Sequence, residues 1–328
     1  MALCQAYDVA LLDLDGVVYL GGAAIPGAAQ ALTSARQRGM QLAYVTNNAS
    51  RTPAAIAAQL TSLGVTASPS DIVTSAQAAA HLLADRLPAG APVLVVGGMG
   101  LRLALRERGL RPVSTAAEHP AAVVQGFAAD IGYPLLAEAA LAILAGAWYV
   151  ASNGDLTLPT SRGPQPGNGS LVQVLVAATG QHPVVAGKPE PPLHAESIAR
   201  TGAKRPLVVG DRLDTDIAGA VSGGSDSMLV LTGVTDAAGA ILARPGERPT
   251  YLASSVAGLL EPQPPVVAEA GEFRCGGWSA RPDGASLGVA GNGEPLDGLR
   301  ALCAAGWSAD QVTGEAAAAA VRKLGLPG

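Results

Sequence analysis

Val9-Ala10-Leu11-Leu12-Asp13-Leu14-Asp15-Gly16 is the part of the sequence that best indicates the fold class. Its four apolar residues are typical of a short strand that is buried on both faces, as in a parallel sheet. Two carboxylates and a glycine follow at once, at the carboxyl end of the strand, where open α/β sheets bind their ligands. The sequence therefore predicts a parallel sheet with a polar site at its carboxyl edge.

Helical and strand patterns alternate outward from this stretch. A helix is predicted from about Gly27 to Arg38, a strand at 42–45, and a second helix that begins at the N-cap pair Thr52-Pro53. Further buried strands are predicted late in the chain, at residues 184–186, 207–209 and 228–231. This alternation predicts an α/β fold whose core is a doubly wound, Rossmann-like parallel sheet.

The segment between these two series has strands and helices of its own. Strands are predicted at 93–96, 122–125 and 148–150, so we expect an α/β cap domain inserted into the core. The expected boundaries are a catalytic core at 1–81 and 183–260, an inserted cap at 82–182, a linker at 261–265 and a small α+β C-terminal domain at 266–328.

The C-terminal domain follows Glu261-Pro262-Gln263-Pro264-Pro265, a stiff linker that no helix or central strand would accept. Strands at 274–280 and 285–290 are predicted to form a hairpin around Asp283-Gly284, followed by helices at 296–305 and 315–324. The pattern is similar to part of an acetyltransferase-like fold. The segment is too short for a whole one and has no glycine-rich pyrophosphate loop, so we expect an accessory unit that does not bind coenzyme A and is dispensable for chemistry.

Composition argues against several classes of protein. Hydrophobic residues make up 49% of the chain, which argues against wholesale disorder. Lys+Arg 21 against Asp+Glu 26 gives a net charge of -5, which argues against a nucleic-acid-binding surface. The longest apolar stretch, Leu135–Val150, contains Glu138 and ends in a strand-like pattern, so no membrane-spanning segment is predicted.

The cysteines and the N-terminus indicate the cytoplasm. Cys4, Cys275 and Cys303 are too few and too scattered for a disulfide framework or a metal clip. The chain reaches Asp8 before any long apolar run and lacks the features of a signal peptide. We expect a cytoplasmic protein without nucleic-acid or membrane partners, and a homo-oligomer stays open.

A second group of acids occupies the same kind of position as the first. The run from Gly210 to Asp216 follows a buried strand and contains Asp211, Asp214 and Asp216. A lone D-x-D-G is as often a solvated turn, but two such groups can meet at one sheet edge and would repel each other there. A hard divalent cation with oxygen ligands resolves that repulsion, so the sequence predicts a Mg²⁺ site.

The same edge offers groups that complement a phosphate. Thr46-Asn47-Asn48 ends one predicted strand and can present a hydroxyl, side-chain amides and backbone N–H groups, although Asn-Asn alone is more often a turn. Gly187-Lys188-Pro189 ends another strand, and the proline restricts the chain so that Lys188 is held near the strand end.

In the order D-x-D-G, T-N-N, G-K-P and G-D-x-x-x-x-D, these residues resemble the four motifs of haloacid-dehalogenase-superfamily phosphatases. Closer similarity extends from Asp13 through Gly21, at Ile25-Pro26-Gly27-Ala28, and from Gly210 through Ile217. These stretches resemble the subfamily with a large α/β cap, which includes p-nitrophenyl phosphate, phosphoglycolate and glycerol-phosphate phosphatases. The resemblance covers about residues 5 to 258.

The resemblance implies a role for each motif residue. Asp13 becomes the nucleophile that forms an aspartyl phosphate, and Asp15 the general acid and base, with a proton affinity raised by its neighbour. The resemblance further implies phosphate binding by Thr46, Asn47 and Lys188, Mg²⁺ binding by Asp13, the backbone carbonyl of Asp15 and Asp211, and orientation of the residues around the metal by Asp216 and Asp214.

Substrate choice is expected to lie in the cap, in a long loop that contains Asn153, Asp155 and Arg162. The pocket is expected to be polar and short of aromatic residues, which suits glycerol 3-phosphate first and 2-phosphoglycolate next. Two alternatives stay open. One is a receiver-like module that keeps a phosphoryl group on an aspartate as a signal, and the other is a phosphotransferase. Asp15 and the insertion of about 100 residues favour the hydrolase.

Overall fold

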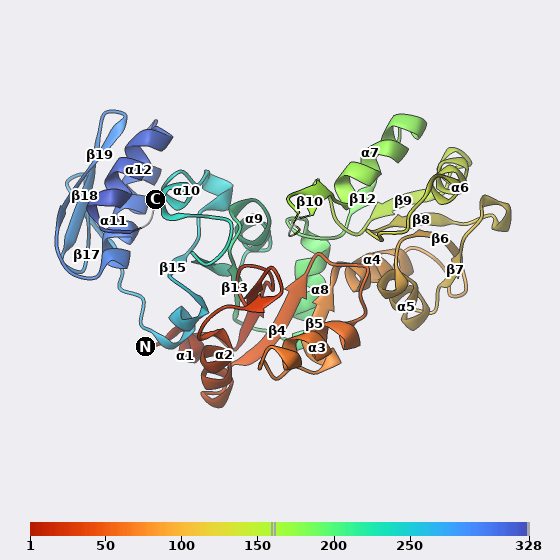
Figure 1. Cartoon of the computed structure of the whole chain (residues 1–328), viewed down its shortest axis with the longest axis horizontal. Coiled ribbons are helices and arrows are strands. Elements are labelled where there is room, and N and C mark those ends of the chain that lie inside the picture. The colour runs from red at the N-terminus through yellow and green to blue at the C-terminus, as the bar shows by residue number, and fades with distance from the viewer. Residues whose placement is uncertain (159, 161, 327–328) are drawn as a thin grey trace. The chain divides into compact units, whose positions relative to one another are not determined.

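The computed structural model describes residues 1–158, 160 and 162–326 (Figure 1). The chain forms two compact units, Met1–Leu42 with Lys204–Gly328, and Ala43–Ala203. In each unit helices pack against parallel strands, so the predicted α/β fold class is confirmed.

The first unit contains four parallel strands in the order β15-β14-β13-β1. Their bounds are Val9–Leu12 for β1, Pro206–Gly210 for β13, Asp226–Val230 for β14 and Tyr251–Ala253 for β15. Strands β1, β13 and β14 were predicted, and β1 is buried along its whole length. The short strand β15 was not predicted, because three residues are too few to show a period.

Helices and a small hairpin complete the core part of the first unit. The predicted helix after β1 is α2, Ala28–Gln37. The other elements are α1 Leu3–Ala6, the hairpin of β2 Tyr19–Leu20 and β3 Ala23–Ala24, the π-helical turn η3 Leu213–Ile217, α9 Ala218–Ser222, α10 Ala237–Ile241, and the 3₁₀ turns η4 Pro245–Glu247 and η5 Val256–Leu260.

The C-terminal segment is a four-stranded antiparallel sheet followed by two helices, in the order β16-β17-β18-β19. Their bounds are Val267–Glu269, Glu272–Cys275, Trp278–Asp283 and Ser286–Gly291 for the strands, and Pro295–Ser308 and Gly314–Lys323 for α11 and α12. The predicted hairpin and helices are confirmed. The single strand predicted at 274–280 is wrong, because a turn at Gly276, with φ +54, separates β17 from β18.

The C-terminal segment packs on the core part of the first unit. Leu299 and Leu302 of α11 share one hydrophobic cluster with Ile241 of α10 and Leu252 of β15, and Figure 1 shows α10 beside α12. The indole N–H of Trp307 donates to the carbonyl of Ala240 at 3.1 Å. The C-terminal segment is therefore an addition that packs against the core part of its own unit.

The second unit contains a five-stranded parallel sheet in the order β12-β9-β8-β6-β7. Its strands are β6 Pro92–Val96, β7 Arg111–Val113, β8 Ala122–Gln125, β9 Trp148–Ala151 and β12 Val184–Val185. The chain enters the second unit along β4 Gln41–Thr46, which pairs in parallel with β5 Ile72–Thr74.

The described residues of the second unit form six helices. The first of them, α3, begins as predicted, because Thr52 Oγ1 accepts the N–H of Ala55 at 3.3 Å. The helices are α3 Pro53–Ser62, α4 Ser75–Ala84, α5 Met99–Glu107, α6 Tyr133–Leu144, α7 Asn168–Thr179 and α8 Pro191–Thr201. The minor elements are β10 Thr157–Leu158, β11 Gln165–Pro166, and the 3₁₀ turns η1 Pro69–Asp71 and η2 Ala116–Glu118.

The strand predicted at 184–186 differs from expectation in burial and in partner. Val184 is 42% exposed, so this is not a fully buried strand. It forms β12, an edge strand that pairs with β9 of the five-stranded sheet. The apolar pair Val184-Val185 cannot by itself distinguish an edge strand from a central one.

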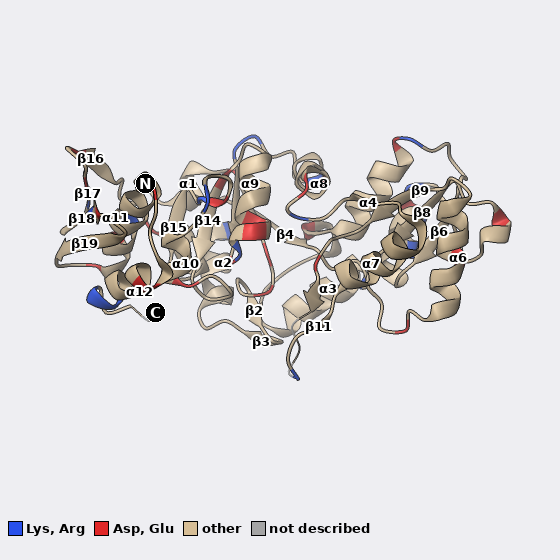
Figure 2. Ribbon diagram, turned by 90° about the horizontal axis from the view of Figure 1, so that it is seen from above, with Lys and Arg blue, Asp and Glu red and all other residues tan. Residues whose placement is uncertain are grey.

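The structure shows where the basic residues and the cysteines lie. Lys and Arg residues are dispersed along the described part of the ribbon (Figure 2). Cys4, Cys275 and Cys303 are free thiols, and all three are buried. Among the described residues, no helix is long and apolar enough to cross a membrane.

Candidate active site

Three carboxylates of the first unit converge at the ends of two neighbouring strands. Asp13 follows β1 and Asp211 follows β13, and the N–H of Asp13 donates to the carbonyl of Val209 at 2.8 Å. One carboxylate oxygen from each of Asp13, Asp211 and Asp216 lies within 4.8 Å of the others. Asp211 and Asp216 are each only 2% exposed, and Asp13 is half-buried.

This donor set suits a hard divalent cation. Three carboxylates so close together, with two of them buried, repel one another strongly unless a positive charge compensates them. Mg²⁺ prefers oxygen ligands and is commonly bound through one or two carboxylates. The residues present therefore fit the Mg²⁺ site that the sequence predicts.

Two glycines let the main chain approach these acids. Gly16 has φ +79, and a Cβ there would overlap the carboxylate of Asp211. A Cβ on Gly210 would overlap the side chain of Asp216. Glycine is thus required at both places for steric reasons, and at Gly16 for backbone conformation as well.

Residues after a third strand also bind the segments that carry these acids, and the sequence did not predict this. The N–H of Val234 donates to Asp211 Oδ2 at 2.7 Å, and the hydroxyl of Thr232 donates to the carbonyl of Gly16 at 2.5 Å. Both residues follow β14, which ends at Val230. Thr232-Gly233 directly after a predicted strand was the signal that could have identified this segment.

Asp15 lies on the loop that leads into the β2–β3 hairpin, and its side chain keeps contact with solvent. Partial loss of water around it raises the pKa of its carboxyl group, while hydrogen bonds from the backbone of Gly21 and Gly16 act in the opposite direction. A raised proton affinity was predicted. Its main cause is desolvation and not the neighbouring acid.

The two acids of η3 have different surroundings. Asp216 accepts the N–H of Arg212 at 3.2 Å and belongs to the carboxylate group. The carboxylate of Asp214 is 61% exposed and is bound by the Arg212 guanidinium at 3.0 and 2.8 Å. That hydrogen bonding lowers the pKa of Asp214. The structure therefore brings together Asp13, Asp211 and Asp216, and Asp214 is not in this group.

In the second unit, the predicted phosphate-binding residues lie around the end of β4. Thr46 is buried, and its hydroxyl oxygen accepts the N–H of Asn48 at 3.1 Å. Lys188 is half-buried, and its Nζ donates to the carbonyl of Val45 at 3.3 Å.

The side-chain amide of Asn47 joins Lys188 to the cap loop. Asn47 Nδ2 donates to the carbonyl of Lys188 at 3.1 Å and to both carboxylate oxygens of Asp155 at 3.2 Å, and Asn47 Oδ1 accepts the N–H of Lys188 at 2.8 Å. Both N–H groups of this amide are used within the protein. The sequence predicts that side-chain amides of this motif face the phosphate. The side chain of Asn47 instead binds Asp155 and the main chain of Lys188.

The other cap residues are divided between interior and surface. Asn153 is 4% exposed, and its Nδ2 donates to the carbonyl of Asn47 at 2.8 Å. Arg162 is exposed, and its N–H donates to Thr160 Oγ1 at 3.2 Å. The long loop that was predicted contains the β10–β11 hairpin, in which Thr157 pairs with Pro166.

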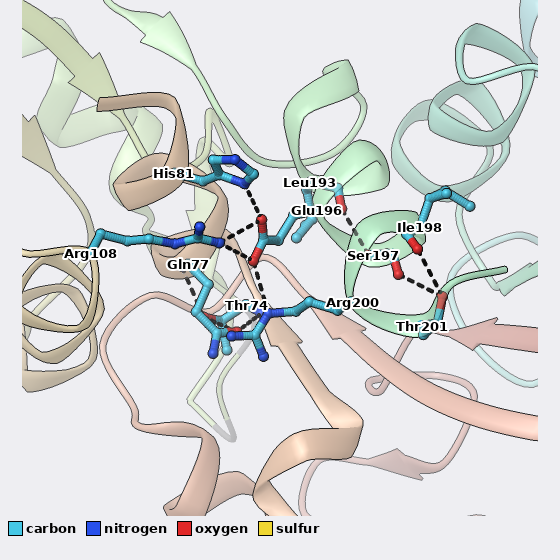
Figure 3. A network of polar contacts seen from close by, with 10 residues as sticks. All are labelled: Thr74, Gln77, His81, Arg108, Leu193, Glu196, Ser197, Ile198, Arg200 and Thr201. Carbon is cyan, nitrogen blue, oxygen red and sulfur yellow. Dashed lines mark hydrogen bonds and ion pairs between the residues drawn. The ribbon is translucent and has the colours of Figure 1, made fainter. Parts of the chain in front are cut away.

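The four histidines, at positions 81, 119, 182 and 194, do not have the sequence spacing of a metal site. His119 and His182 are exposed, and none of the four histidines is in the carboxylate group found among the described residues. His81 binds Glu196, which also binds Arg108 and Arg200 (Figure 3). That network joins α4, α8 and the C-terminal end of α5.

Comparison with protein families gives three matches along the chain. Residues 10–111 match the haloacid dehalogenase-like hydrolase model, and residues 185–259 match a second, HAD-hydrolase-like model. Residues 275–326 match the GCN5-related N-acetyltransferase like domain. The resemblance of the last segment to part of an acetyltransferase fold is thereby confirmed.

Individual relatives are phosphatases. The chain is 46% identical over 325 residues to D-glycerol 3-phosphate phosphatase of Mycobacterium tuberculosis, a match that covers 94% of this chain and 88% of that protein. It is 39% identical to a 5'-nucleotidase of Bacillus subtilis, over 70% of this chain and 90% of the relative. The crystal structure of the M. tuberculosis glycerol phosphate phosphatase in complex with magnesium superposes with a TM-score of 0.90 at 44% identity and covers 99% of both chains.

Proposed function

This chain belongs to the haloacid dehalogenase-like hydrolases and is a phosphoric monoester hydrolase, and we propose that its substrate is glycerol 3-phosphate, with 2-phosphoglycolate as second choice. The relative that matches nearly the whole chain is named for glycerol 3-phosphate, which supports the first choice. Aromatic residues are only 3% of the chain, and a nucleotide base would call for stacking partners.

The observation that carries the proposal is the group of Asp13, Asp211 and Asp216, with carboxylate oxygens within 4.8 Å of one another. We assign Mg²⁺ to this group, bound by Asp13, Asp211 and the backbone carbonyl of Asp15, with Asp216 orienting the surrounding residues. When bound, Mg²⁺ offsets negative charge on the phosphoryl group and orients it. The magnesium complex of the M. tuberculosis relative supports this assignment.

Asp13 is the proposed nucleophile and Asp15 the proposed general acid and base. A carboxylate oxygen of Asp13 forms a bond to phosphorus while the ester P–O bond breaks, and Asp15 gives its proton to the departing alkoxide. Asp15 then takes a proton from a water molecule that attacks the aspartyl phosphate, which releases phosphate and restores Asp13. The raised pKa of Asp15 supports this role, because the acid must hold a proton before the first step.

Three residues of the second unit are proposed to bind the phosphoryl oxygens. Thr46 would do so through its hydroxyl, Asn47 through its backbone N–H, and Lys188 through its ammonium group. Compensation of charge supplies most of the catalysis in phosphoryl transfer, because the protein has little covalent work to do there.

The loop with Asn153, Asp155 and Arg162 is proposed to set substrate preference. Of these three, Arg162 is exposed and cationic, and we assign it to the leaving group. Replacing Arg162 with Ala should then change the relative kcat/KM among natural esters more than it changes hydrolysis of p-nitrophenyl phosphate.

We propose that the enzyme is cytoplasmic, acts on a small phosphate ester and has no nucleic-acid or membrane partner. The net charge of -5 and the dispersed basic residues support the absence of a nucleic-acid partner. A homo-oligomer is compatible with the proposal, and light scattering of the purified protein measures it.

The test is to measure kcat/KM with Mg²⁺ for a panel of esters: glycerol 3-phosphate, 2-phosphoglycolate, sugar phosphates and 5'-nucleotides. We expect glycerol 3-phosphate to rank first, activity to vanish with EDTA and Mg²⁺ to restore it. A higher kcat/KM for another ester would overturn the substrate assignment, and a metal-independent rate would overturn the Mg²⁺ site. A receiver-like module would become phosphorylated without turnover, and a phosphotransferase would pass phosphate to an added alcohol.

A further inference from the structure

Asn47 holds the main chain of Lys188 at two points. Its Oδ1 accepts the Lys188 N–H at 2.8 Å, and its Nδ2 donates to the Lys188 carbonyl at 3.1 Å. A carboxamide thus pairs with both polar groups of one residue, as a neighbouring strand would. Gly187 makes this approach possible, because a Cβ there would overlap both Asn47 Oδ1 and the carbonyl of Ser152.

Asp155 fixes which way the Asn47 amide points. An amide has a donor end and an acceptor end of almost equal size, and only one orientation matches the N–H and the C=O of Lys188. An ionised carboxylate can only accept, and both oxygens of Asp155 lie 3.2 Å from Asn47 Nδ2. This charge-assisted hydrogen bond therefore favours the orientation that Lys188 needs.

Asp155 is itself held by the cap. Its N–H donates to Asn153 Oδ1 at 3.2 Å, and its carbonyl accepts the N–H of Gly169, near the start of α7, at 2.8 Å. Asn168, which is 2% exposed, donates its side-chain N–H to the carbonyl of Asn153 at 2.7 Å. The carboxylate of Asp155 thus projects from a segment whose main chain is fixed at several atoms.

The main chain of Asn47 is also fixed. Its carbonyl accepts from Asn153 Nδ2 at 2.8 Å and from Ser75 Oγ at 2.6 Å, and both partners are buried. Asn47 therefore has a fixed backbone and a side chain whose orientation depends on Asp155.

We propose that Asp155 and Asn47 are positioning residues for Lys188, with Asp155 acting through the Asn47 amide and not by contact with the leaving group. The proposal rests on the proposed function, in which Lys188 binds the phosphoryl oxygens. Because every ester presents the same phosphoryl group, a displaced Lys188 lowers the rate on all substrates alike. The cap loop would then be a support of the phosphate site as well as a selector of substrate.

The first experiment compares Asp155→Ala and Asn47→Asp with wild type on glycerol 3-phosphate, 2-phosphoglycolate and p-nitrophenyl phosphate. We expect kcat/KM to fall about 10–100-fold by the same factor on all three esters, the size usual for outer partners of a site. Inhibition by inorganic phosphate should weaken in the same variants. Asp155→Asn keeps an acceptor for Asn47 Nδ2 and should recover much of the loss. Two exposed residues of the C-terminal segment supply matched controls: Asp310→Ala and Asp310→Asn for the two changes at Asp155, and Asn292→Asp for Asn47→Asp.

The second experiment repeats Asp155→Ala in a Lys188→Met background and measures inorganic phosphate affinity by calorimetry. If Asp155 acts through Lys188, the added change leaves the affinity unaltered. A further loss there, or a fall on one ester with p-nitrophenyl phosphate hydrolysis unchanged, would overturn the proposal. The proposed function would be contradicted by a different result: neither the wild-type protein nor the Asp310→Asn control would hydrolyse any ester with Mg²⁺. Unfolding midpoints within a few degrees of wild type distinguish these outcomes from misfolding.

Discussion

At the scale of single residues, the carboxylate group depends on how closely the main chain approaches it. Gly16 and Gly210 lie against Asp211 and Asp216, where any side chain would collide with them. The Val234 N–H fixes one oxygen of Asp211 at 2.7 Å. The acids are therefore pre-positioned by their surroundings, which lets a cation bind without first ordering them.

Asp13→Asn should abolish turnover and leave the fold intact. A carboxamide is a poor nucleophile and a poor ligand for Mg²⁺, so we expect kcat to fall by about 10³-fold or more. Steady-state kinetics with Mg²⁺ measures the loss, and circular dichroism checks the fold. Activity close to that of wild type would refute the nucleophile assignment.

Asp15→Asn should reduce kcat by about 10²–10⁴-fold, the usual contribution of a general acid and base. The variant cannot protonate the leaving alkoxide or activate water. Rapid quench with a ³²P-labelled ester measures the phosphoenzyme, and we expect it to form slowly and to persist. A variant with normal turnover and no slow phosphoenzyme would show that another group handles the proton.

The sequence identified most of this site because its chemistry lies in types of residue at strand ends. Asp13 and Asp211 follow recognisable strands, and their convergence follows from parallel pairing. The hydrogen-bond partners of the Asn47 side chain could not be predicted, because they are 108 and 141 positions away in the sequence. Only three-dimensional contact shows that its amide is already engaged.

At the scale of elements, α8 is joined to α4 and α5 through one buried carboxylate. Glu196 on α8 has a side chain that is 1% exposed and binds His81 on α4, Arg108 after α5 and Arg200 on its own helix (Figure 3). Burial alone would raise the pKa of Glu196, but hydrogen bonds from His81 and Arg200 and the charge of Arg108 lower it overall. The charged form is thus the one that the folded protein favours.

This network should make stability depend on pH. Because the pKa of Glu196 is lower in the folded than in the unfolded chain, its contribution is complete above the unfolded value of about 4.3 and is lost as pH falls through the folded value. Glu196→Gln should lower the free energy of unfolding by about 1–3 kcal/mol at pH 7. Urea titrations should show this difference shrinking below about pH 4.

The control is Glu118→Gln, which breaks a surface ion pair between Arg111 and a side chain that is 40% exposed. It should change the free energy of unfolding by less than about 1 kcal/mol. A Glu196 effect that is equally large at pH 7 and at pH 3 would assign the loss to packing and not to charge.

The predictions that were wrong concern elements whose burial or length depends on the neighbouring strands. The apolar pair at Val184-Val185 predicted a buried strand, but its burial is set by its place at the sheet edge. The break between β17 and β18 falls at Gly276-Gly277 inside an otherwise strand-like run. By contrast, α3 was predicted to the residue at its start, because an N-cap and a first-turn proline are local signals.

At the scale of the whole molecule, the C-terminal segment shares its core with the first unit. Leu299, Leu302 and Val321 are fully buried in one cluster with Ile241 and Leu252. The domain boundaries predicted from the sequence remain a prediction. Cutting the chain at the predicted boundary before the C-terminal segment would expose the apolar residues of the core that belong to this cluster.

Truncation at Pro265 should therefore leave chemistry intact and lower stability. The folded fraction should keep its kcat, since the carboxylates and Lys188 all precede the cut, while the thermal midpoint falls and aggregation increases. Leu302→Ala in the full chain is a milder version, expected to cost about 2–5 kcal/mol with kcat unchanged. A soluble, folded truncation without activity would show that this segment completes the active site.

The pairing of β1 with β13 has a consequence for how the protein is made. Val9 pairs with Pro206, so this edge of β1 waits for 197 further residues. At synthesis rates of about 5–20 residues per second, the ribosome needs roughly 10–40 s to supply them. The second unit is one continuous stretch and is complete by Ala203, before β13 has been synthesised. The nascent chain thus carries an apolar strand edge exposed for seconds, and it is in this interval, not in the finished enzyme, that a chaperone would be needed.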